Sequence, residues 1–66
     1  MRVTINGRPR ELAAPVALAE LIAELGLAEK RLAVEINGEI VPRSRHPQTR
    51  VRDGDRLEIV QAIGGG

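Results

Sequence analysis

The sequence lacks three features that would assign it to large functional classes. It has no cysteine, which excludes disulfides, thiolate metal ligation and a cysteine nucleophile on the chain. It has no Phe, Trp or Tyr, so nucleic-acid bases find no ring to stack on and the core must be built from Leu, Ile and Val. No apolar run approaches the roughly 20 residues that span a bilayer. We therefore expect a soluble cytoplasmic protein without a membrane partner.

Length and composition predict one small folded domain. The chain has 66 residues, of which 42% are hydrophobic and 29% charged, and its net charge is +1. This balance is not that of a disordered chain, and there is no room for a second domain. We expect a single domain over residues 1–66, with a flexible glycine tail at 64–66.

The N-terminal segment predicts a β-hairpin. Met1, Val3 and Ile5 alternate with polar residues, and the dipeptide Asn6-Gly7 that follows accepts the positive φ angles of a type I′ turn. The second strand of the hairpin, through Leu12, contains Pro9, which has no N–H for the ladder, so this strand should lie at an edge of its sheet or pair only in part.

A helix is predicted between Pro15 and Gly26. Its apolar residues recur with the period of one helix face, and Gly26 is placed to end it in the left-handed conformation. The start is less defined, because no side-chain oxygen is available to cap the first amides. The apolar stripe consists of Leu18, Leu21, Ile22 and Leu25.

The rest of the chain returns to period two. A strand with Leu32, Val34 and Ile36 on one face runs into a second Asn-Gly turn, and a short strand should end near Pro42. A polar connection with one helical turn follows. A last strand then directs Leu57 and Ile59 to the core.

The order of these elements predicts an α+β domain. A hairpin, one crossover helix and further strands give a mixed sheet of four to five strands packed on one main helix. This is the order of a β-grasp, or ubiquitin-like, domain.

The chain stops on three glycines, Gly64, Gly65 and Gly66. Three interpretations compete: a disordered end without a role, a linker remnant, and a reactive terminus. Glycine stabilises no fold, but a strand-borne glycine arm can enter a channel too narrow for other residues and present the carboxylate of Gly66. That carboxylate needs activation, most directly by ATP. The chain has no phosphate-binding loop, and its one histidine, His46, has no evident partner, so the activating enzyme must be another protein.

The segments "EINGEIVPRSRH" and "DGDRLEIVQAIGGG" at this spacing resemble the ThiS family of sulfur carriers in thiamine biosynthesis. "VTINGRPREL" and "LAELIAELGL" are similar to that family as well, so the resemblance covers essentially the whole chain. It implies that Gly66 is adenylated and converted to a thiocarboxylate, with Gly65 completing the terminal pair and Gly64 extending it.

The resemblance also implies partners. An E1-like adenylyltransferase of the ThiF type would activate the tail with ATP, a sulfur-donating enzyme would supply sulfur, and a ThiG-type thiazole synthase would accept it. The carrier would bind no metal and no cofactor and would not itself be an enzyme. Two alternatives remain: a sulfur carrier for molybdopterin synthesis, and a ubiquitin-like module that binds partners without covalent chemistry.

Two surface features have both a functional and a plain interpretation. Arg43 and Arg45 belong to an arginine-rich stretch that is either a solvated face or a docking patch for an acidic partner. These arginines are also the sole argument for nucleic-acid binding, and the low net charge makes that function a poor candidate. Val60, Ala62 and Ile63 would form an apolar anchor at the base of the tail, unless Ile63 closes the edge of the core.

Overall fold

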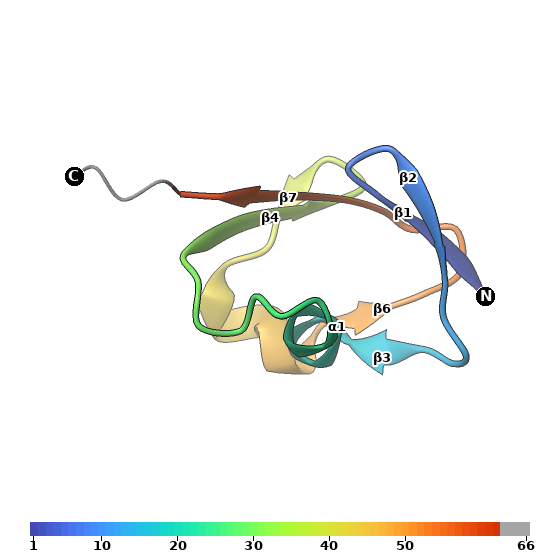
Figure 1. The fold of residues 1–66 in the computed structure, drawn as a ribbon, viewed down its shortest axis with the longest axis horizontal. Coiled ribbons are helices and arrows are strands. Elements are labelled where there is room, and N and C mark those ends of the chain that lie inside the picture. The colour runs from blue at the N-terminus through green and yellow to red at the C-terminus, as the bar shows by residue number, and fades with distance from the viewer. Residues whose placement is uncertain (63–66) are drawn as a thin grey trace.

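A five-stranded sheet covers one helix in this computed structural model, which describes residues 1–62 (Figure 1). The strand order in the sheet is β2-β1-β7-β4-β5, with β1 and β7 parallel and the other neighbours antiparallel. The elements are β1 (Arg2–Ile5), β2 (Arg8–Glu11), β3 (Val16–Ala17), α1 (Leu18–Glu24), β4 (Leu32–Ile36), β5 (Glu39–Ile40), the 3₁₀-helix η1 (Arg43–Gln48), β6 (Arg50–Val51) and β7 (Arg56–Gln61). The predicted α+β arrangement, a mixed sheet on one main helix, is confirmed.

Both predicted hairpins are present. Asn6 and Gly7 have φ angles of 52° and 81°, and Asn37 and Gly38 have 53° and 85°, as type I′ turns require. The strand that contains Pro9 is β2, which lies at an edge of the sheet, so that prediction is also confirmed.

The core lies between the sheet and α1. The helix contributes its predicted stripe, except that Leu25 is only half-buried, and the sheet contributes alternate residues of its central strands. Aliphatic side chains alone fill the space, as the composition predicts. The buried core residues are Val3, Leu12, Leu18, Leu21, Ile22, Val34, Val51, Leu57 and Ile59.

The helix begins at Leu18, the first residue of its apolar stripe, and not directly after Pro15. Val16 and the following Ala17 instead form β3, which pairs with β6 in a second, two-stranded sheet that the sequence did not predict. The N–H of Leu18 donates to the carbonyl oxygen of Thr49 at 2.7 Å. No side chain caps this helix. A backbone carbonyl from a distant part of the sequence satisfies its first amide instead.

The helix ends as predicted. Gly26 has a φ of 78°, and its N–H donates to the carbonyl of Ala23 at 3.0 Å. The N–H of Leu27 donates to the carbonyl of Ile22, also at 3.0 Å. These two bonds form a Schellman motif, which fixes the direction in which the chain leaves the helix toward β4.

Candidate functional site

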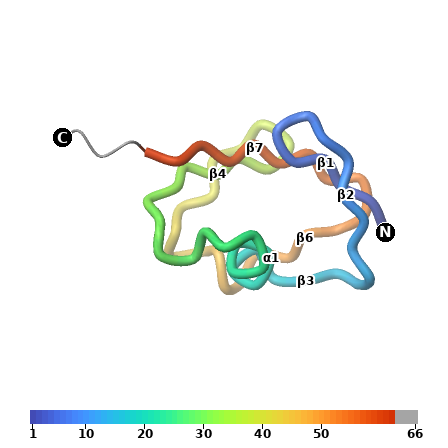
Figure 2. The backbone as a smooth tube through the Cα atoms, in the orientation of Figure 1, coloured from blue at the N-terminus to red at the C-terminus, as the bar shows by residue number. Residues whose placement is uncertain are grey.

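The last strand, β7, occupies the middle of the sheet and carries the chain toward its C-terminal glycines. It pairs with β1 on one side and with β4 on the other. Beyond its end, the N–H of Ala62 donates to the carbonyl oxygen of Arg31 at 2.9 Å. The chain is thus held to the sheet up to the last residue described, at the end of the molecule opposite the N-terminus (Figures 1 and 2).

Two asparagine side chains fasten β7 further. The Nδ2 of Asn6 donates to the carbonyl oxygen of Ile59 at 3.0 Å, and its Oδ1 accepts from the N–H of Ile59 at 2.8 Å. In the second turn, the Oδ1 of Asn37 accepts from the N–H of Arg56 at 3.0 Å. Each asparagine thus has two roles, since its backbone supplies the positive φ of a turn and its side chain continues the ladder onto β7. The Asn-Gly pattern in the sequence predicts only the turn role.

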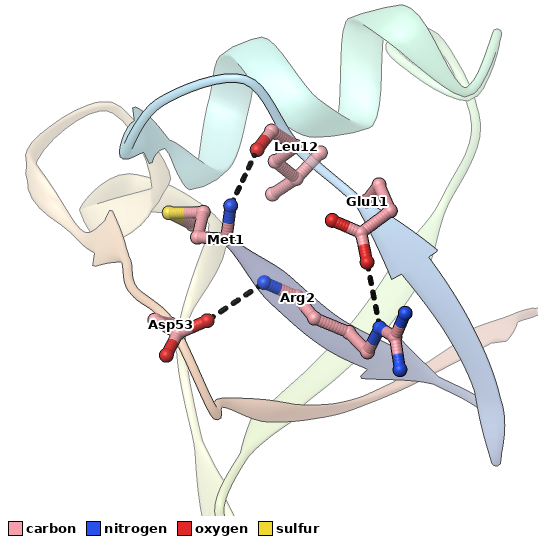
Figure 3. A network of polar contacts seen from close by, with 5 residues as sticks. All are labelled: Met1, Arg2, Glu11, Leu12 and Asp53. Carbon is pink, nitrogen blue, oxygen red and sulfur yellow. Dashed lines mark hydrogen bonds and ion pairs between the residues drawn. The ribbon is translucent and has the colours of Figure 1, made fainter.

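Polar contacts around β1 hold the sheet at its other end (Figure 3). The amino group of Met1 donates to the carbonyl of Leu12 at 2.9 Å, and the N–H of Arg2 donates to Oδ1 of Asp53 at 2.7 Å. Arg2 also pairs with Glu11 across the hairpin, with its Nε 2.6 Å from Oε1. Because β1 is the parallel neighbour of β7, these contacts support the strand that leads to the tail.

The predicted apolar anchor is partly described. Val60 is 63% exposed and lies opposite Ala33 in the ladder. It follows the core residue Ile59 in the strand, so its side chain lies on the sheet face away from the core. Ala62, two residues on, is also exposed. The remaining predicted site residues, Ile63, Gly64, Gly65 and Gly66, lie outside the residues that the structure describes.

The two arginines of the predicted docking patch line different hollows. Arg43 donates from Nη2 to the carbonyl of Ala28 at 3.0 Å and from Nη1 to the carbonyl of Lys30 at 3.3 Å. It therefore ties η1 to the loop between α1 and β4. Arg45 is exposed and lines a separate groove between β5 and β6. Exposed arginines Arg50 and Arg52 line that same groove.

His46 differs from its sequence interpretation as a residue of a polar loop without a partner. It is the one buried polar residue among those described, with 7% of its surface exposed. Its Nε2 lies 3.0 Å from the carbonyl oxygen of Val41. A carbonyl oxygen can only accept, so Nε2 is the donor, and His46 joins η1 to the end of β5.

Within residues 1–62, no three side chains of the metal-ligating types gather in one place. No helix of the described part is long and apolar enough to cross a membrane.

A mixed sheet on one helix, with a fastened central strand that leads into terminal glycines, defines the class of ubiquitin-like β-grasp proteins. The ThiS family model matches residues 3–66, and the chain belongs to the ThiS family.

Solved and curated relatives agree with this assignment. The crystal structure of the thiamine biosynthesis protein ThiS from Geobacter metallireducens superimposes with a TM-score of 0.86 at 35% identity, covering all of both chains. The sulfur carrier protein ThiS of Escherichia coli is 35% identical over 66 residues, the whole of both proteins. A thiazole synthase of Paramagnetospirillum magneticum is 48% identical over the whole of this chain, which spans 20% of that protein's length.

Proposed function

We propose that the protein is a sulfur carrier that delivers sulfur, as a thiocarboxylate on Gly66, for the thiazole moiety of thiamine. The observation that carries the proposal is the fastened end of β7, from which the sequence passes within two residues into Gly64, Gly65 and Gly66. The sheet up to Ala62 is a rigid support for the tail, and the glycines are the part that enters the active site of an enzyme. Family membership supports the same conclusion.

The chemistry occurs in two steps at one carboxylate. An oxygen of the Gly66 carboxylate attacks the α-phosphate of ATP, and pyrophosphate leaves. A sulfur nucleophile then attacks the acyl carbon of the adenylate, and AMP leaves with its oxygen. Where the donor is a persulfide, this attack gives an acyl disulfide, and a thiol reductant cleaves its S–S bond and leaves as part of a new disulfide. The carrier then ends on a thiocarboxylate, with one sulfur in place of one oxygen. A ThiF-type adenylyltransferase and a sulfur-donating enzyme catalyse these steps, so the carrier binds no cofactor of its own.

The glycines serve this chemistry by their lack of side chains. Without Cβ atoms, Gly64 and Gly65 pass through a narrow channel in whatever backbone conformation it imposes. Val60 and Ala62, exposed at the base of the tail, together with Ile63, provide the apolar contact by which the enzyme grips the domain. Arg45 contributes a charged contact from its groove, whereas the main role of Arg43 is to hold the α1–β4 loop.

The acceptor we propose is a ThiG-type thiazole synthase. Two proteins named thiazole synthase, from Paramagnetospirillum magneticum and Magnetococcus marinus, match this whole chain over 20% of their own length. Their names and this match support a functional link between a carrier-like segment and a synthase. The proposed reactions belong to the cytoplasm.

ATP–pyrophosphate exchange tests the activation step. The chain should stimulate exchange by a ThiF-type enzyme, and a variant without Gly65 and Gly66 should not, although its fold is retained. Equal stimulation by the truncated variant would show that the tail is not the group activated, and would leave a non-covalent interaction module as the better account.

A further inference from the structure

A pocket lined by cationic and apolar groups lies beside the base of the tail. Its volume is about 160 Å³. Its walls come from α1, from the loop before β4, from the first residue of β4 and from η1. The lining residues are Ala19, Ile22, Ala28, Lys30, Leu32, Arg43, His46 and Pro47.

The pocket adjoins the point where the chain leaves the sheet. Leu32, which lines it, is the ladder partner of Gln61 in β7. Arg31, which holds Ala62 by the 2.9 Å hydrogen bond, stands between two lining residues, Lys30 and Leu32. In Figures 1 and 2, the loop from α1 to β4 lies at the same end of the molecule as the end of β7.

The polar groups of the pocket favour an anion. Lys30, the one lysine of the chain, and Arg43 supply positive charge, and no Asp or Glu lines the pocket. Neither cation is in an ion pair with a carboxylate of residues 1–62. The guanidinium group of Arg43 uses two of its five N–H bonds on the loop carbonyls, so it still has donors free.

His46 lines the pocket but adds no donor for an anion. Its Nε2–H is donated to the carbonyl oxygen of Val41, so Nδ1 of the neutral ring is an acceptor. The donors that the pocket offers to an anion are therefore those of Lys30 and Arg43. The His46 ring lines the same hollow, so its NMR signals report whether the pocket is occupied.

We propose that this pocket receives a carboxylate side chain, an aspartate or a glutamate, of the enzyme that activates the tail. The apolar walls accommodate the methylene groups, and Lys30 and Arg43 face the carboxylate. Because the pocket borders the residues that hold Ala62, this contact fixes how the base of the tail sits on the enzyme. The assignment of the partner rests on the proposed function, whereas the anion preference of the pocket does not.

The first test uses the chain alone, with acetate as the carboxylate probe and acetamide as its uncharged counterpart of similar shape. In NMR titrations, acetate should cause saturable shifts at the His46 ring and the Lys30 amide, with a dissociation constant on the order of 10 mM. Acetamide should not. Lys30→Gln should weaken the acetate response several-fold, while the matched variant Arg10→Gln, an exposed cation of β2, should leave it unchanged.

Equal responses to acetate and acetamide, or an unchanged response in Lys30→Gln, would overturn the pocket as an anion site. The substitution is suited to this test because Lys30 is exposed and its described hydrogen bonds are made by backbone atoms, to Leu27 and from Arg43. A third outcome concerns the chain's own terminal carboxylate. If deletion of Gly65 and Gly66 shifted the His46 signals and raised the acetate affinity, that carboxylate would be the occupant, and the partner assignment would be wrong.

The second test uses the full chain with a ThiF-type enzyme and measures thiocarboxylation by intact mass. Lys30→Gln should lower kcat/KM about five- to tenfold with kcat unchanged, and Arg10→Gln should remain within about twofold of the unaltered chain. Lys30→Glu should be rescued by one Asp or Glu to Lys substitution on the enzyme, which would identify the carboxylate.

Equal effects of the Lys30 and Arg10 variants, or no rescue by any such substitution on the enzyme, would overturn the proposed contact. Absence of conversion of the unaltered chain would instead refute the proposed function and the partner assignment together. The acetate titration would still decide whether the pocket itself binds carboxylates.

Discussion

Replacement of Asn6 by glycine isolates the contribution of its side chain to the strand that carries the tail. Asn6 has a φ of 52°, which glycine adopts freely, so Asn6→Gly preserves the turn. It removes the 3.0 Å and 2.8 Å hydrogen bonds to the backbone of Ile59, both partly buried. At about 0.5–1.5 kcal/mol net for each bond, the free energy of unfolding should fall by about 1–3 kcal/mol.

Asn37→Gly is the matched control for this prediction. Asn37 occupies the same turn position at a φ of 53°, but its side-chain bonds to Arg56 and Asp55 are exposed to solvent. Effects of glycine on the turn and on the unfolded chain should therefore be alike in the two variants. The excess loss in Asn6→Gly reports the partly buried bonds to β7, and we expect Asn37→Gly to lose less than half as much.

The assay is urea unfolding followed by far-UV circular dichroism, because the chain has no aromatic residue for fluorescence. For a domain of this size, each kcal/mol should also lower the Tm by about 4–8 °C. Hydrogen exchange of the Ile59 amide should accelerate in Asn6→Gly and not in Asn37→Gly. Equal stability of Asn6→Gly and the unaltered chain would refute the role assigned to this side chain.

Three further predictions, one of them with a control variant, test other parts of the account. Gly26→Ala should cost about 1 kcal/mol in thermal or urea unfolding, since the space around Gly26 is open and the φ of 78° alone penalises a side chain; a neutral effect would contradict the Schellman end. Arg43→Ala should lower the free energy of unfolding by about 1 kcal/mol and accelerate amide exchange in the α1–β4 loop, whereas Arg45→Ala should change neither quantity. Equal behaviour of the two variants would show that Arg43 does not hold this loop. Leu21→Ala, at a fully buried position, should cost about 2–5 kcal/mol and leave the domain largely unfolded, and a native circular dichroism spectrum with full stability would contradict the core described.

Features fixed by a few neighbouring residues could be predicted from the sequence. The two Asn-Gly turns, the helix stop at Gly26 and the edge position of the strand with Pro9 all follow from local backbone chemistry. The alternation that directs Leu57 to the core is likewise local. These features sufficed to define the β-grasp order.

Features that depend on partners distant in the sequence could not be predicted from it. β3 and β6 have two residues each, too few to show a period, and they form only because the fold brings them together. The carbonyl of Thr49, which is distant in the sequence but adjacent in the fold, satisfies the first amide of α1, so no capping residue marks that helix start. The same holds for Asn6, whose bond partner is 53 positions away, and for His46, whose burial depends on the packing of η1 against α1.

The candidate site likewise has a part that could be predicted from the sequence and a part that could not. The reactive end stays a prediction, made from the C-terminal glycines and the family resemblance, since its proposed chemistry needs no neighbours on this chain. The charged surface was predicted as one patch around Arg43 and Arg45, and the structure places these two side chains in different hollows. Sequence proximity suggested the patch, but η1 turns the two arginines toward different parts of the domain.

The central claim is that Gly66 carries sulfur, and the intact mass of the chain tests it most directly. The chain should be incubated with ATP, a ThiF-type enzyme and a sulfide or persulfide source, beside the variant without Gly65 and Gly66. A gain equal to one sulfur replacing one oxygen, located in the C-terminal peptide and absent from the truncated variant, is the result that our account predicts. An unchanged mass, with an enzyme that converts its own carrier under the same conditions, would contradict it.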